Sequence, residues 1–395
     1  MFAEIKTIPF IEKFCLQENL SCYDPYDIWK TSIGKKIKYL FYKNKITGIL
    51  PAATLTLFDL FLNNSYRFGY QKQEYPMVRA LSALALLELF DNGQTVNYLH
   101  VAEKHIRWLV ENFSKGYNGY CWGMNTLWVS KNGVYPPQTP YITNTPYVLE
   151  ALIKYREKTG NKGFDPVIKS VFDFIEKDIL VLKSDADQLA LSYAPVKENR
   201  IVINANSYAM YCYALLLPYF PDKQAYIKEK ILRLYNFIVN FQQTDGSWYY
   251  YADTLSGNFI DCFHSCFILK NIFKAQLLFP LNQADTIIQK GYNYVKNNFY
   301  DNKTKLARRF SISDKPSMVK YDLYDNAELL NVALLLKDHP LVHSLSSTIQ
   351  NYFIINNDIY SIIDIFGIKR NKNTLRWAVL PYLYVLTMKL HAEKN

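Results

Sequence analysis

The sequence predicts an all-α fold, an α/α toroid of about six helical hairpins with short β-like loops over one end. Two observations favour this fold. Strongly apolar helices alternate along the chain with amphipathic ones, and a short aromatic segment precedes most of the apolar helices. The chain has 395 residues, of which 50% are hydrophobic, so it is long enough to bury a large core.

Each predicted hairpin pairs a buried inner helix with an outer one. Residues 78–90 (VRALSALALLELF) are apolar almost all round, which is typical of a buried helix. Residues 96–113 carry apolar side chains on one side and charged ones on the other, as expected for an outer helix. We expect the last inner helix to pair with residues 50–62. Further inner helices are predicted to begin near Pro146, Asn206, Asp261, Tyr324 and Leu375, and outer helices near Asp165, Lys223, Gln283 and Leu341.

Short extended segments stand ahead of the inner helices. In a closed ring they would meet at one end and form a central cleft, which is the arrangement that we expect. An open solenoid of helix pairs predicts short, similar loops, whereas these loops are long, irregular and aromatic. We divide the chain into an N-terminal extension packed on the ring, 1–50, and a toroid domain, 51–395. The segments are 119–123, 191–194, 246–250, 307–310 and, as a weaker copy, 359–362.

Charge and cysteine content bear on the partners and the compartment. Lys and Arg number 45 against 35 for Asp and Glu, a formal net charge of +10, and such a field attracts anions of any chemical kind. No predicted helix carries a continuous basic stripe, so we expect no nucleic acid. The Cys residues form no CxxC pair, and the sequence shows neither a signal peptide nor a membrane-spanning run. We expect a cytoplasmic protein. Peripheral contact with the inner membrane through a basic face is a further possibility that the sequence leaves open.

The segment 242–248 (QQTDGSW) ends an outer helix, and its Asp-Gly pair is a strong turn signal. It resembles the repeat of terpenoid-cyclase-type toroids, in which a Gln-rich helix end and Asp-Gly-Ser-Trp tie neighbouring hairpins together. This resemblance implies a structural role for Trp248. The cyclases' aspartate-rich acid has no counterpart here, and Asp261-Cys262 lacks the spacing of the zinc ligands in protein prenyltransferases. We expect no metal and no cofactor.

A second resemblance covers most of the chain through several short motifs. It is similar to helical-toroid proteins of bacterial surface-polysaccharide biosynthesis, which are distantly similar to the toroidal catalytic domain of heparosan glucuronyl 5-epimerases. The resemblance implies a glycan context more directly than it implies a reaction. The motifs are 24–27 (DPYD), 120–123 (YCWG), 139–140 (TP), 192–193 (SY), 204–206 (NAN), 245–248 (DGSW) and 260–264 (IDCFH).

The loops contain the residue types that sugar binding requires. Aromatic faces cover the C–H surfaces of a sugar, and amides bind its hydroxyl groups, on the apolar lining with few polar groups that is usual for ligand sites. The same residues would otherwise fill the core or cap helices. The candidate aromatic faces are Trp122, Trp128, Tyr141, Tyr193, Trp248 and Tyr250, and the candidate amides are Asn144, Asn204, Asn206 and Asn258.

Two further groups could carry chemistry. Asp261 and His264 are three residues apart on one helix face, and a His beside a carboxylate has a pKa that can be tuned for acid–base catalysis. A satisfied core histidine is the alternative interpretation. Arg308 and Arg309 could hold a sugar carboxylate in bidentate fashion if they face the cleft. They could instead form an ion-pair cluster with the acidic residues at 322–328.

The leading hypothesis is a carbohydrate-active enzyme of surface-polysaccharide metabolism that acts on an acidic, uronate-containing oligosaccharide or polysaccharide. Epimerisation and elimination both begin with abstraction of the proton next to the carboxylate, and both need a base and a group that neutralises developing charge. The candidate bases are His264, Tyr193 and Tyr250, and the candidate charge-stabilising groups are Arg308, Arg309, Asn204 and Asn206.

Two alternatives remain open from the sequence. A glycoside hydrolase would need two carboxyl groups across the scissile bond, and Asp261 with Asp325 would be the pair. A non-catalytic glycan-binding or scaffold protein of polysaccharide assembly would need no acid–base residue.

Overall fold

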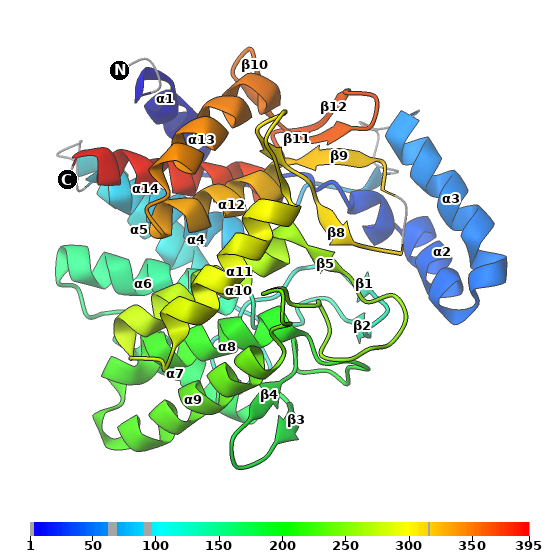
Figure 1. The fold of residues 1–395 in the computed structure, drawn as a ribbon. Helices are drawn as coiled ribbons and strands as arrows, with labels where there is room; N and C mark the ends of the chain where they lie inside the picture. Colours follow the sequence, from blue (N-terminus) through cyan, green and yellow to red (C-terminus); the bar gives the residue numbers. More distant parts are fainter. Residues whose placement is uncertain (1–3, 62–68, 91–95, 315–316, 395) are drawn as a thin grey trace.

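The computed structural model describes residues 4–61, 69–90, 96–314 and 317–394. Within these ranges the inner helices form a closed ring (Figure 1). Each inner helix packs against the next, and the last packs against both its predecessor and the first, which closes the ring and excludes the open solenoid. The inner helices are α4 (Pro76–Phe90), α6 (Thr145–Thr159), α8 (Ile203–Leu216), α10 (Cys262–Leu278), α12 (Leu323–Leu335) and α14 (Leu380–Lys394).

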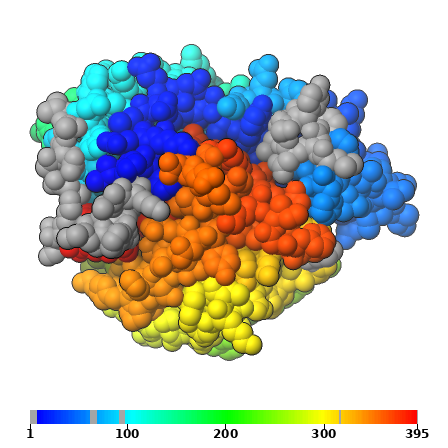
Figure 2. Space-filling view, turned by 90° about the horizontal axis from the view of Figure 1, so that it is seen from above, coloured from blue at the N-terminus to red at the C-terminus, as the bar shows by residue number. Residues whose placement is uncertain are grey.

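An outer helix covers each inner one, and the outer helix on α14 differs from the expectation. It is α1 (Glu4–Cys15), which packs on α14 and α4 and buries Ile11, Phe14 and Cys15 there. Figure 2 shows this N-terminal segment beside the C-terminal part of the chain. The predicted pairing of α14 with residues 50–62 is therefore wrong. The other outer helices are α5 (Val96–Glu111), α7 (Asp165–Lys177), α9 (Gln224–Asn240), α11 (Ala284–Asn298) and α13 (His339–Phe353).

The residues predicted to pair with α14 instead belong to a helical hairpin at the edge of the molecule. It consists of α2 (Ser32–Lys43) and α3 (Lys45–Phe61), which pack on each other (Figure 1). The Thr31 side chain caps the start of α2 by accepting the Gly34 N–H at 3.0 Å.

Burial agrees with the predicted division into inner and outer helices. Every residue of α8 is buried, and so is all of α4 except its last residue, whereas α7 buries only one face. An apolar helix wholly surrounded by other helices needs no polar face. Because each hairpin returns the chain, all inner helices run in the same direction and begin at the same end of the ring, which we call the mouth.

Short antiparallel strands precede the inner helices, confirming the predicted β-like loops. The largest sheet has the order β10-β11-β12, with β9 also paired to β11. The pairs outside it are β1–β2, β3–β4, β5–β8 and β6–β7. The strands are β1 (Trp128–Val129), β2 (Val134–Tyr135), β3 (Val181–Ser184), β4 (Leu189–Leu191), β5 (Ile260–Asp261), β6 (Tyr300–Asp301), β7 (Leu306–Ala307), β8 (Phe310–Ile312), β9 (Val319–Asp322), β10 (Ile354–Ile355), β11 (Asp358–Asp364) and β12 (Lys369–Lys372).

Two buried tryptophans connect neighbouring elements in the same way. The indole N–H of Trp122 donates to the Leu109 carbonyl in α5 at 2.8 Å, and that of Trp248 donates to the Ile238 carbonyl in α9 at 2.9 Å. Trp122 is 0% exposed and Trp248 is 2% exposed. Both indoles are therefore covered by protein, which corrects the prediction of Trp122 as a sugar-stacking residue and, for Trp248, agrees with the structural role that the resemblance implies rather than with sugar stacking. Gly291 in α11 leaves room for Trp248, because a Cβ there would lie 2.5 Å from its ring.

Two buried asparagines form a second repeated brace. The Asn206 Oδ1 accepts the Leu191 N–H at 2.7 Å, and its Nδ2 donates to the Val202 carbonyl at 2.9 Å. Asn326 makes the equivalent bonds with Ala307 and with the carbonyl of Asp322, at 2.7 and 2.8 Å. Each amide ties a strand to the following inner helix and satisfies backbone groups that would otherwise be unpaired. Asn206 is thus a brace, which corrects its prediction as a substrate-binding residue.

Candidate active site

The mouth brings together side chains from the start of every inner helix. The first turn of a helix leaves backbone N–H groups unpaired and carries a partial positive charge, so parallel inner helices direct this charge to one end of the ring. Because the positions lie far apart in sequence, closure of the ring is what assembles the site. The side chains at these positions are Tyr75, Asn144, Asn204, His264, Asp325 and Arg376.

Aromatic rings line the mouth. Phe263 and Tyr324 stack with centroids 5.4 Å apart and planes 8° from parallel. The His264 ring lies 4.0 Å from Phe263 and 4.5 Å from Tyr250, while Trp377 lies 4.8 Å from Tyr324. Phe263, Tyr324 and Trp377 are buried, so only His264 and Tyr250 of this cluster present part of a ring to a ligand.

Two of the predicted aromatic residues, Tyr141 and Tyr193, lie close together. The rings of Tyr141 and Tyr193 are 5.3 Å apart, and Thr143 donates to the Tyr193 hydroxyl at 3.1 Å. Tyr193 and Tyr250 are half-buried, whereas Tyr141 is 5% exposed. The two half-buried tyrosines are the ones that a ligand in the mouth could touch.

Asp261 and His264 form a hydrogen-bonded pair at the start of α10. The His264 Nδ1 lies 2.8 Å from both carboxylate oxygens of Asp261, and Asp261 also caps the helix by accepting the His264 backbone N–H at 3.2 Å. The His264 side chain is 21% exposed, and its Nε2 has no hydrogen-bond partner among the described residues. A carboxylate on Nδ1 fixes the tautomer that leaves Nε2 able to accept a proton.

Arg309 enters the mouth from the strand side. Its Nη1 donates to the Tyr26 hydroxyl at 2.9 Å and pairs with the Asp322 carboxylate at 3.2 Å. Its Nε is buried and has no hydrogen-bond partner within the described part of the chain. Burial raises the pKa of the Tyr26 phenol to about 12, so this group stays neutral and accepts the bond from Arg309. The exposed part of the guanidinium, 14% of the side chain, is the part that could meet an oxyanion.

The neighbouring Arg308 lies outside the site. Its side chain is 64% exposed and pairs with Asp301 at 2.8 Å. Successive residues of an extended segment point to opposite faces, so Arg308 and Arg309 cannot both face the mouth. This corrects the prediction that they act together on a sugar carboxylate.

Asp325 is completely buried beneath the mouth. Its Oδ1 accepts the Phe263 N–H at 3.1 Å, while its Oδ2 has no partner within the described ranges. Burial, and then the nearby Asp322 carboxylate, raise the pKa of Asp325 well above the ordinary carboxyl range.

The predicted amides have different surroundings. Asn144 is half-buried, and its Nδ2 lies 3.4 Å from the Trp122 carbonyl. Asn204 is 2% exposed, and its Oδ1 has no partner among the residues that the structure describes. Asn258 holds the loop before β5, donating to the Tyr251 and Asp253 carbonyls at 2.9 and 2.7 Å.

Sequence reasoning missed Glu198, which is hydrogen-bonded to Tyr135 and Tyr193. Its Oε1 accepts the Tyr135 hydroxyl at 2.8 Å, and its Oε2 accepts the Tyr193 backbone N–H at 2.8 Å. Burial raises the pKa of the Glu198 carboxyl to about 7. A carboxyl group that titrates near neutrality can give or take a proton. No motif surrounds Glu198, and its raised pKa depends on partners that only the fold brings near.

The segment before α2 also contributes to the mouth. Arg376 forms an ion pair with Asp24, which Lys30 approaches at 3.6 Å. Burial opposes the charged form of Asp24, but Arg376 and Lys30 outweigh it and hold the pKa of Asp24 below its ordinary value. The 24–27 motif therefore anchors the N-terminal segment across the mouth through charge pairing.

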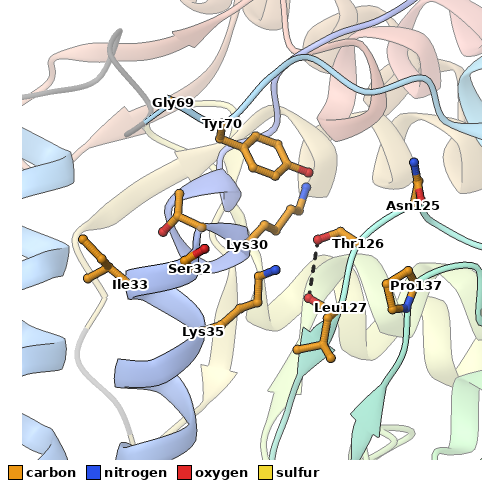
Figure 3. A pocket seen from close by; sticks show the side chains of 11 residues that line it. Lys30, Ser32, Ile33, Lys35, Gly69, Tyr70, Asn125, Thr126, Leu127 and Pro137 are labelled. Carbon is orange, nitrogen blue, oxygen red and sulfur yellow. Dashed lines mark hydrogen bonds between the residues drawn. The ribbon is translucent and has the colours of Figure 1, made fainter.

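A separate cavity of about 400 Å³ lies beside the mouth (Figure 3). Its wall includes Lys30, Lys35, Tyr70 and Thr126, and the figure shows Tyr70 and Lys30 directed toward each other. Lys30 Nζ is held by Asp27 at 2.9 Å. None of the residues predicted for the site lines this cavity.

Deeper in the ring, polar side chains close the axis below the mouth. Lys270 pairs with Glu328 at 2.6 Å and donates to the Tyr147 hydroxyl at 3.2 Å, which in turn lies 2.9 Å from that of Tyr208. All four side chains are buried. The described residues contain no cluster of His, Cys, Asp and Glu that could hold a metal ion.

Neither a family model nor a curated protein matches the sequence. Several solved structures are similar in fold. A sugar epimerase from a ruminal bacterium is 14% identical, with a TM-score of 0.63 over 82% of this chain and 88% of that chain. Cellobiose 2-epimerase from Bacillus thermoamylovorans is 13% identical, with the same TM-score and coverage.

A family 76 glycoside hydrolase, an α-mannanase from Bacteroides thetaiotaomicron, is 13% identical with a TM-score of 0.60 over 94% of this chain and 99% of that chain. At this level of identity the likeness concerns the fold. The chain has the α/α-toroid architecture of these carbohydrate-active enzymes.

Proposed function

We propose that this protein is a carbohydrate-active enzyme that moves a proton at a sugar carbon next to a carboxylate or carbonyl group. The observation that carries the proposal is the Asp261–His264 pair, which leaves Nε2 of a partly exposed imidazole at an aromatic mouth. The sugar epimerases of similar fold are consistent with it.

In the proposed reaction His264 Nε2 takes the proton, and the electron pair of the broken C–H bond moves into the adjacent carbonyl or carboxylate oxygen. Arg309, whose side chain is 14% exposed, is the candidate group to stabilise the resulting oxyanion. Return of a proton to the opposite face completes an epimerisation, and loss of the substituent one carbon further on completes an elimination. Glu198 and Tyr250 are the candidate donors for the return step.

A uronate is the proposed substrate because the mouth offers Arg309 and the positive ends of the inner helices to a carboxylate. Surface-polysaccharide metabolism remains the proposed context, on the resemblance of the short motifs. Asp322 already pairs with Arg309 and so weakens its attraction for a second carboxylate. A neutral sugar with a carbonyl group is therefore the second candidate substrate.

The hydrolase alternative has less support from the side-chain contacts. Both Asp261 oxygens accept from His264, and Asp325 is 0% exposed, so neither carboxyl is presented to a scissile bond. We assign Asp261 as a positioning residue for His264.

One assay separates these reactions. Uronate oligosaccharides and neutral reducing disaccharides would be incubated with the protein in D₂O and followed by NMR, ultraviolet absorbance and a reducing-end assay. Deuterium at one sugar carbon, lost in His264→Gln, supports proton transfer, and an added ultraviolet chromophore identifies elimination. Release of new reducing ends without deuterium would overturn the proposal in favour of hydrolysis, and binding without turnover would favour a glycan-binding protein.

A further inference from the structure

The α2–α3 hairpin exposes a continuous apolar face. On α3 the residues of this face recur at helical spacing, so they form one stripe. Their exposures are large: Ile46 87%, Ile49 58%, Leu50 73%, Leu57 51% and Phe61 47%. Single exposed apolar residues are ordinary, but a stripe along a whole helix marks an interaction surface.

The stripe continues beyond the hairpin. Phe61 meets Phe366 with ring centroids 6.1 Å apart, and Phe366 lies in the turn between β11 and β12 with a 65% exposure. Ile365 and Ile368 in the same turn are 46% and 50% exposed. Two separate parts of the chain therefore contribute to one apolar surface.

The exposed charge on this hairpin is positive, because Asp59, the one acidic residue between Ser32 and Phe61, is half-buried near the end of α3. Between Trp29 and Phe58 the chain carries no acidic residue. Exposed Tyr39 and Tyr42 add rings with one apolar and one polar end, a type favoured where an apolar phase meets water. The lysines of this stretch are Lys30, Lys35, Lys36, Lys38, Lys43 and Lys45, of which Lys36, Lys43 and Lys45 are exposed.

We propose that the α2–α3 hairpin docks the protein on an anionic lipid bilayer, with the α3 stripe in the interface and the exposed lysines on the headgroups. An apolar helix face bordered by lysines and tyrosines is the chemistry of an interfacial helix. Among the described residues, every helix is too short or too polar to cross a bilayer. The hairpin therefore lies on the surface. An apolar protein partner or a second copy would account for the stripe but not for the excess of exposed lysines beside it.

The test is flotation of the purified chain with vesicles of phosphatidylcholine alone or mixed with phosphatidylglycerol. We expect binding to the anionic vesicles only. The double variant Leu50→Ser, Leu57→Ser and the triple variant Lys36→Glu, Lys43→Glu, Lys45→Glu should each lower the partition coefficient at least about tenfold. Thermal melts confirm that each variant is folded.

Matched controls separate a local surface from the overall charge. Leu277→Ser removes another exposed leucine, 69% accessible at the end of α10. A triple change to Glu at Lys162, Lys290 and Lys303 alters the net charge equally at exposed positions elsewhere. Both controls should retain binding. Equal loss in the control triple, no binding to anionic vesicles at low salt, or a dimer in light scattering that Leu50→Ser dissolves would each overturn the proposal.

Discussion

The repeated braces and the residues at the mouth have opposite properties. Trp122 and Trp248 make the same indole-to-carbonyl bond in two hairpins, and Asn206 and Asn326 make the same strand-to-helix bonds in two others. These residues are buried and their polar atoms are paired.

His264, Arg309 and Glu198 do not repeat from hairpin to hairpin. His264 is partly exposed, Arg309 has a donor without a partner in the described residues, and Glu198 has a carboxyl pKa raised to about 7. The comparison teaches that the repeat of this ring serves its stability, while the departures from the repeat carry the chemistry. Four predictions test this distinction.

The largest effect is expected from His264→Gln. Glutamine keeps a polar group of similar length but cannot act as a base, so turnover should fall by about 10²- to 10⁴-fold. The thermal midpoint should change little, because the side chain is partly exposed. Steady-state kinetics together with a melting curve would check both parts, and a large fall in stability with proportionate loss of activity would assign His264 to the braces.

Trp248→Ala should have the converse effect. Removing a fully buried indole and its hydrogen bond should lower the free energy of unfolding by about 3–5 kcal/mol. Activity per folded molecule should be retained below the lowered melting temperature. Urea titration measures the loss, and Trp122→Ala should match it within about 1 kcal/mol because its bond is the same. Loss of sugar affinity in a stably folded Trp248 variant would argue against the brace.

Glu198→Gln should change the pH dependence of stability. Because the folded-state pKa is raised from 4.5 to about 7, the native chain binds a proton that the unfolded chain releases, and stability falls as pH rises from about 4.5 through 7. The variant lacks this titration. The difference in unfolding free energy between wild type and variant should therefore shrink or reverse from pH 5 to pH 8, as urea titrations at each pH would show. If the difference in unfolding free energy did not change with pH, the pKa of the Glu198 carboxyl would not be raised by folding.

Arg308→Ala should have the smallest effect. Its ion pair with Asp301 is exposed, and such pairs contribute at most about 1 kcal/mol. Stability and turnover should both stay close to wild type. Arg309→Gln is the matched comparison, in which turnover should fall. Equal losses in the two variants would show that both guanidinium groups serve the same site.

The ring could be predicted because its signals are local. Apolar residues all round 78–90 and one-sided patterns in the outer helices require only neighbouring residues to be interpreted, and closure follows from enough hairpins of similar length. The partner of α14 could not be predicted in this way. Residues 4–15 and 45–61 are both helical and largely apolar, and only packing shows that the first covers the ring.

The site was predicted in part. Asp261 and His264 are three residues apart and the structure confirms their contact, but Asp261 is the extended N-cap residue before α10 and not part of its face. Trp122 and Tyr193 stand at similar positions in their hairpins, yet Trp122 is buried and Tyr193 is half-buried. The residue types alone do not predict this difference. Glu198 depends on Tyr135, which the fold supplies from 63 residues away.

The most direct test of the central claim is nitrogen NMR of the six His and six Trp side chains during titration with a glucuronate-containing disaccharide and with cellobiose. The account predicts that one of the two sugars moves the resonance of His264 Nε2, while those of Trp122 and Trp248 stay in place. Movement of Trp122 and Trp248 with His264 unchanged would contradict it.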